Sequence, residues 1–132
     1  MNVDRLETLA MFEGTFINRY GYDVYHNLLY DFLLLLDEYN IVSFSKVYKT
    51  VLIYILLNYQ KNDKIIIDYN DWSKKLGYSK NSIKSVIHFL SRRAKLLKFD
   101  GYVVYNKRIS ASIYILLKDC LLYTSPSPRD RQ

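Results

Sequence analysis

The chain has few of the residues that build metal sites, redox sites or phosphate-binding loops. Among its 132 residues there are one cysteine and two histidines, and His26 and His88 lie far apart in the sequence. No group of histidine, cysteine and carboxylate residues has metal-ligand spacing. The four glycines, at positions 14, 21, 77 and 101, are isolated, which excludes a glycine-rich phosphate loop. We therefore expect no enzymatic activity, no catalytic residue, no metal and no cofactor.

Long apolar runs are also missing. The longest cover residues 32–36 and 51–57, and both are far shorter than the roughly 20 residues that a membrane-spanning helix needs. The N-terminus carries Asp4 and Arg5, and no apolar signal segment follows them. These absences predict a cytoplasmic protein that does not enter a membrane.

Proline occurs only at positions 126 and 128, in a C-terminal segment that also holds the only cysteine, Cys120. Residues 120–132, CLLYTSPSPRDRQ, differ abruptly in composition from the rest, as a fusion scar does. From Cys120 to Asp130 the segment resembles a translated sequencing adapter, and a natural Ser/Pro tail is the alternative. We expect residues 120–132 to be a non-native, disordered tail and the natural chain to be cut near Asp119.

Basic residues are in excess, and they are clustered. The formal net charge is +6; two of the 19 basic and one of the 13 acidic residues lie in the tail, which leaves 17 and 12. No acidic residue occurs between Asp71 and Asp100, whereas eight basic residues do: Lys74, Lys75, Lys80, Lys84, Arg92, Arg93, Lys95 and Lys98. Such a run would attract a polyanion, although a solvated basic helix face is the common alternative.

The spacing of apolar residues predicts helices in the N-terminal part. A short helix should end near Gly14, a second should cover residues 22–39 with Asp23 in its first turn, and a third should cover 46–58 after a cap at Ser43 or Ser45. The third has a broad apolar face (Val47, Val51, Leu52, Ile55, Leu56). The helix at 22–39 could either pack on the domain as an extra element or form a dimer interface.

The second half of the sequence predicts a short edge strand at 64–68, two helices and a strand pair. Asn70 or Asp71 should cap a helix whose Trp72 and Leu76 face inward, and Gly77 should end it in the left-handed conformation. Ser79 should cap a helix with an apolar stripe at Ile83, Val86, Ile87, Leu90, Ala94 and Leu97, ended by Gly101. Residues 102–105 and 109–116 should form strands joined at Asn106 and Lys107, with Ala111, Ile113 and Ile115 on the core side.

The helix after Ser79 carries the candidate site. With Ile83 at the centre of its buried face, a step of about 100° per residue places Asn81, Ser85, His88 and Arg92 on the opposite side. Lys84 and Lys95 then lie on the flank. These side chains can reach phosphates or base edges, and the backbone N–H groups at Ser79 and Lys80 can bind a phosphate.

The segment from Asp68 to Ile83, DYNDWSKKLGYSKNSI, resembles the bacterial winged helix-turn-helix pattern. In that pattern a helix ends in Leu-Gly, an aromatic or β-branched residue and a serine follow, and the next helix starts with polar residues before Ile or Val. The resemblance covers about residues 45–117 and is specific to the superfamily. Within it the chain looks similar to replication initiators and replisome organisers of plasmids, phages and low-GC bacteria, and small transcription regulators fit as well. The apolar stretch 96–102 departs from the pattern and leaves the end of the helix open.

The resemblance implies a mainly α fold with a small β-hairpin wing: an N-terminal helical extension at 1–42, a winged helix-turn-helix domain at 43–119 and the tail at 120–132. It implies sequence-specific binding of double-stranded DNA through a major-groove recognition helix at about 79–97, in a truncated initiator or a regulator. A winged helix that binds only proteins is the alternative, and a homodimer through 22–39 is possible. The implied base contacts are Asn81, Lys84, Ser85 and His88; the implied phosphate contacts are Ser79, Lys80, Arg92, Lys107 and Arg108.

Overall fold

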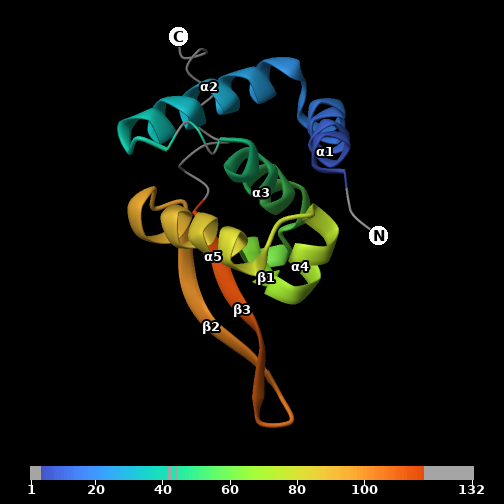
Figure 1. Cartoon of the computed structure of the whole chain (residues 1–132), viewed down its shortest axis with the longest axis vertical. Coiled ribbons are helices and arrows are strands. Elements are labelled where there is room, and N and C mark those ends of the chain that lie inside the picture. Colours follow the sequence, from blue (N-terminus) through green and yellow to red (C-terminus); the bar gives the residue numbers. More distant parts are fainter. Residues whose placement is uncertain (1–3, 42, 44, 118–132) are drawn as a thin grey trace.

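The computed structural model describes residues 4–41, 43 and 45–117. They form a mainly helical molecule with a small antiparallel sheet, as the sequence predicts in outline. Figure 1 shows α1 and α2 covering one end, α3 in the middle, α4 and α5 beneath it, and a β-hairpin that projects from the helices. The predicted tail, 120–132, lies outside the described residues.

The N-terminal extension consists of two long helices, α1 (Arg5–Tyr20) and α2 (Tyr22–Glu38). The Asp4 side chain accepts hydrogen bonds from the N–H groups of Leu6 and Glu7, which caps α1. The prediction that this helix ends near Gly14 is wrong, because α1 continues to Tyr20 and buries Phe16 beyond that glycine. Packing of the apolar face outweighs the low helix propensity of one glycine.

The helix α2 is an extra element that packs on the rest of the molecule through one face. It runs from Tyr22 almost as predicted, has Asp23 in its first turn and buries Tyr25, Leu28, Phe32 and Leu36. Its inner face therefore contacts other helices of the same chain, so a dimer through α2 would have to use the opposite face.

The central helix α3 (Ser45–Asn58) contributes six buried residues, more than any other helix or strand in the described part of the chain. Four of the five predicted core residues, from Val51 to Leu56, are buried and Val47 is half-buried. The ring of Tyr54 meets Trp72 of α4 edge-on with 4.8 Å between ring centroids. One hydrophobic core thus includes residues of the N-terminal helices, α3, the later helices and the sheet.

The sheet has the strand order β1–β3–β2 and is antiparallel throughout. Its strands are β1 (Lys64–Ile67), which follows a 3-10 turn at Lys61–Asp63, β2 (Leu97–Tyr105) and β3 (Arg108–Leu116). Asn106 and Lys107 both have positive φ, at 52° and 64°, which is the conformation of a two-residue hairpin turn. The predicted turn and the edge position of β1 are confirmed.

The prediction for the core side of β3 is wrong. Ser112, Tyr114 and Leu116 are buried with Ala111, whereas Ile113 and Ile115 are only half-buried. β3 is the central strand, and its apolar alternation therefore does not distinguish the two faces of the sheet.

The helix α4 (Tyr69–Leu76) and the helix α5 (Lys80–His88) are joined by a short turn. Gly77 has φ 80° and ends α4 in the left-handed conformation, and the Ser79 side chain accepts from the N–H of Ser82 at 3.1 Å to cap α5. Both features match the sequence. The cap of α4 is Asp68 rather than Asn70 or Asp71, since its carboxylate accepts from both of those N–H groups.

The end of α5 differs from the prediction. A π-turn covers Phe89–Arg93, and the N–H of Ala94 bonds to the carbonyl of Phe89 at 2.9 Å. Lys95 then takes a positive φ of 60°, and β2 begins at Leu97. The predicted helix to residue 97 is therefore too long, and Gly101 lies within β2 beside a register shift instead of ending a helix.

In the described residues no helix has the length and apolar character that a membrane crossing requires.

Candidate nucleic-acid interface

The four residues expected to contact bases all lie exposed on α5. Ile83, Val86 and Ile87 are buried in the core, so Asn81, Lys84, Ser85 and His88 emerge on the solvent side. The Ser85 hydroxyl donates to the main-chain carbonyl oxygen of Asn81 at 3.0 Å. This bond does not use the side-chain amide group of Asn81, and that residue is exposed. The spacing rule therefore located the exposed face of this helix correctly.

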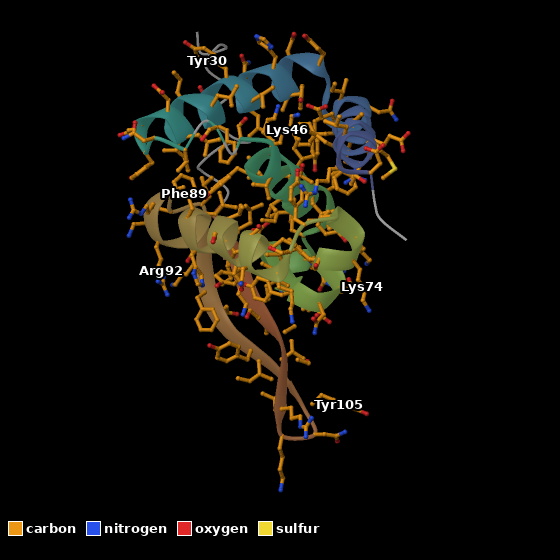
Figure 2. The ribbon with its side chains drawn as sticks, viewed as in Figure 1. Tyr30, Lys46, Lys74, Phe89, Arg92 and Tyr105 are labelled. Atoms are coloured by element: carbon orange, nitrogen blue, oxygen red, sulfur yellow. The ribbon has the colours of Figure 1, made fainter. Side chains whose placement is uncertain are left out.

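Three of the expected residues line one groove between α5 and the hairpin. Lys84, His88 and Arg92 form its helical wall, and the groove has a volume of about 510 Å³. The other lining residues come from the π-turn, α4, β2 and β3: Ser91, Tyr69, Phe99, Tyr102, Ile109, Ser112 and Tyr114. Figure 2 shows Arg92 at the junction between the helices and the hairpin. No carboxylate lies among these lining residues, which gives the groove a cationic character.

One charged side chain of this groove is held beside an aromatic ring. The Lys84 ammonium lies 5.4 Å from the centroid of the Tyr69 ring, a distance suited to a cation–π contact. Burial, followed by the nearby Tyr114 hydroxyl, raises the pKa of Tyr69 well above its usual range. The Tyr69 phenol is therefore a neutral hydrogen-bonding group on the groove wall at physiological pH.

The environment of His88 favours the neutral form of its imidazole in the free protein. Partial burial lowers the pKa of its imidazole, and the positive charges of Arg92 and Lys84 lower it further. A neutral imidazole can both donate and accept a hydrogen bond. An anion that enters the groove would oppose the effect of the two cations, because it favours the protonated ring.

The expected phosphate contacts are spread over two regions. Ser79 and Lys80 are exposed at the start of α5, where the Ser79 hydroxyl is already used in the cap. Lys107 and Arg108 are exposed at the hairpin turn, beside Tyr105, which Figure 2 shows at the projecting end. Only Arg92 of this set lines the groove. The structure therefore separates the wing residues from the helical ones.

The eight clustered cations do not all face the same way. Lys75 pairs with Asp71 at 3.0 Å on the exposed side of α4, and the Arg93 guanidinium lies 5.6 Å from the Tyr39 ring on the side of α2. Lys74 lies on α4 (Figure 2) and is not among the residues that line the groove. The basic run in the sequence thus overstates the charge that faces the groove.

The aromatic part of the groove was missed by the sequence reasoning. Phe99 and Tyr102 of β2 are 45% and 52% exposed, and the Phe99 ring meets Tyr102 and Tyr114 with centroid distances of 5.0 and 5.5 Å. The only signal was the apolar-aromatic stretch at 96–102, which interrupted the pattern. A strand that begins at Leu97, rather than a longer helix, brings these rings opposite α5.

The described residues contain no group of three or more histidine, cysteine or acidic side chains that could hold a metal ion. Comparison of the chain with protein-family models, curated proteins and solved structures finds no match in any of the three.

Proposed function

We propose that this protein binds double-stranded DNA as a winged helix, with α5 as the recognition helix. The observation that carries this proposal is the exposed face of α5, where Asn81, Lys84, Ser85 and His88 stand beside a groove without carboxylates. Amide, hydroxyl, imidazole and ammonium groups can contact base edges in the major groove. The order of α3, α4, α5 and the β2–β3 hairpin supports the wing assignment.

The hairpin would anchor the complex away from α5. Lys107 and Arg108 are exposed at its turn, and nine-residue strands at about 3.3 Å per residue carry them roughly 30 Å along the hairpin. That reach suits phosphates or the minor groove beyond the segment that α5 would contact. The resemblance of the chain to replication initiators and replisome organisers makes that role the first candidate, and a transcription regulator is the alternative role.

The experiment is fluorescence anisotropy of the protein with labelled mixed-sequence duplex DNA over a range of salt concentrations. Binding that weakens steeply with salt supports phosphate contacts, because each neutralised phosphate releases counterions. Absence of binding at low salt would contradict the proposal. A dimer in sedimentation at the same concentrations would favour the regulator, since paired half-sites need two-fold symmetry.

A protein-binding function is the second candidate, and the hairpin favours it. Val104, Tyr105 and Ile109 are exposed there by 62%, 72% and 62%, and apolar side chains gathered on a surface often mark a contact with another protein. Salt-insensitive binding of a protein partner, lost in Tyr105→Ser but retained in Arg92→Ala, would support this candidate over DNA.

A further inference from the structure

The groove between α5 and the hairpin has a composition that an outward-facing recognition helix does not need. Its helical wall carries Lys84, His88 and Arg92, and its sheet wall carries the partly exposed rings of Phe99 and Tyr102. Cations on one side and aromatic rings on the other match a ligand that is anionic at one end and planar at the other. Its volume of about 510 Å³ is within the roughly 300–1,000 Å³ of ligand-binding clefts.

The floor of the groove has a polar group without a partner. Ser112 is 9% exposed and lines the groove, and within the described residues its hydroxyl makes no hydrogen bond. Buried hydroxyls usually have a partner. A ligand with ring nitrogens or carbonyl groups would supply one, and the Tyr69 phenol, which also lines the groove, stays neutral because burial raises its pKa.

We propose that this groove binds one unpaired nucleotide of a DNA strand, with the base against Phe99 and Tyr102 and the phosphate between Lys84 and Arg92. The inference takes DNA as the ligand from the proposed function and adds the class of DNA that is preferred. The argument for a strand is continuity: Lys84 and His88 of the groove lie on the same helix as Asn81 and Ser85, and Arg92 lies in the π-turn that continues it, so a strand that crosses α5 passes the opening of the groove. Stacking on aromatic rings tolerates any base.

The test uses the whole chain and two 20-base-pair duplexes that carry the fluorescent base 2-aminopurine. In one duplex this base is an unpaired bulge, and in the other it is fully paired. We expect about tenfold tighter binding of the bulged duplex and a decrease in 2-aminopurine fluorescence as its base stacks on a ring. Phe99→Ala should abolish both the preference for the bulged duplex and the decrease in fluorescence.

Two further variants separate the effect of the aromatic ring from that of an apolar side chain. Phe99→Tyr should restore the preference because it keeps the ring, whereas Phe99→Leu should not, although it keeps an apolar side chain. Tyr30→Ala is the matched control, since this ring is 61% exposed on α2 at the other end of the molecule. Equal affinities for the two duplexes, or the same loss in Phe99→Leu and Phe99→Tyr, would overturn the proposal.

Two outcomes separate this inference from the function on which it rests. Failure to bind the paired duplex, with the bulged duplex still bound and quenched, would reject the recognition-helix function and retain the groove site. Release of the bulged duplex by micromolar free deoxynucleotide would overturn the strand proposal in favour of a small-molecule nucleotide site. Binding of both duplexes with no quenching would reject the groove site alone.

Discussion

The guanidinium of Arg5, in the first turn of α1, donates from Nε to the carbonyl oxygen of Gly77 at 2.7 Å and lies 4.3 Å from the centroid of the Tyr78 ring. The two contacts join the N-terminal helix to the turn between α4 and α5. An arginine can make both because its planar group stacks on a ring while its edge donates. The N-terminal extension therefore supports the turn that positions α5.

Arg5→Ala should lower the free energy of unfolding by about 1 kcal/mol, because it removes one hydrogen bond and one exposed cation–π contact. Arg5→Lys should recover only part of this loss, since an ammonium does not stack in the same way. Urea denaturation followed by circular dichroism measures the change. Asn18→Ala, at an exposed position of α1, is the control, and an equal loss there would reject a specific role for Arg5.

Two glycines should respond to alanine in opposite directions. Gly77→Ala should cost about 1 kcal/mol, because φ at this position is 80° and a side chain is strained there. Gly14→Ala should stabilise the protein by roughly 0.5–1 kcal/mol, since Gly14 lies inside α1 and an added Cβ meets no atom within 4 Å. Thermal unfolding of both variants tests this, and a gain in Gly77→Ala would contradict the turn assignment.

These two glycines also show what the sequence could and could not predict. The Leu-Gly end of α4 and the Ser79 cap of α5 depend on local rules, namely the tolerance of glycine for positive φ and the preference of serine for a helix start. The end of α1 depends on packing: Phe16 is buried beyond Gly14, and one local residue does not report that contact.

The end of α5 could not be predicted from the sequence for a different reason. Lys95 adopts the left-handed conformation that glycine usually supplies at a helix end, so the sequence carries no glycine signal there, and the next glycine, Gly101, predicts an end that is too late. The π-turn Phe89–Arg93 also breaks the regular spacing of apolar residues. The polar face of the helix was predictable from period alone, whereas the aromatic wall of the groove required the sheet.

Phe32→Ala should destabilise the N-terminal helices together with the rest of the molecule. Phe32 is fully buried, and loss of a core phenylalanine costs about 3–5 kcal/mol. A single denaturation transition at lower urea, seen both by circular dichroism and by the fluorescence of Trp72, is the expected result. Leu34→Ala, at an exposed position of α2, should have little effect. Unfolding of α2 ahead of Trp72 would show that residues 1–42 form a separate unit.

Arg92→Ala and Asn81→Ala should differ in how they affect DNA binding. Loss of a phosphate contact at Arg92 should weaken binding to every duplex and reduce the salt dependence by about one counterion, whereas loss of a base contact at Asn81 should change sequence preference. Anisotropy with several duplexes measures both. Arg93→Ala is the matched control because its guanidinium lies over Tyr39 instead of the groove. Equal loss on all sequences in Asn81→Ala would count against the recognition-helix assignment.

Binding of DNA should tighten as the pH falls through the range in which His88 takes up a proton. Burial, Arg92 and Lys84 hold the pKa of the free imidazole below its ordinary value, which is about 6.5. Tyr69, Tyr102 and Tyr114 also line the groove, and no carboxylate that would offset the two cations lies among its lining residues. A bound phosphate supplies it and raises the pKa of His88 in the complex.

The sign follows from proton linkage. When the complex binds a proton more readily than the free protein, affinity increases as the pH decreases, by at most about tenfold per pH unit between the two pKa values. The free energy of unfolding should instead decrease as the pH decreases. The pKa of His88 is lower in the folded protein than in the unfolded chain, which makes the protein slightly less stable below about pH 6.5. Anisotropy between about pH 7.5 and 5.5, within the range of unchanged circular dichroism, measures the first effect. His26→Gln, at an exposed position of α2 outside the groove, is the control. His88→Gln should abolish the pH dependence of binding and His26→Gln should preserve it; the same pH dependence in both variants would exclude His88 as the group that responds to the phosphate.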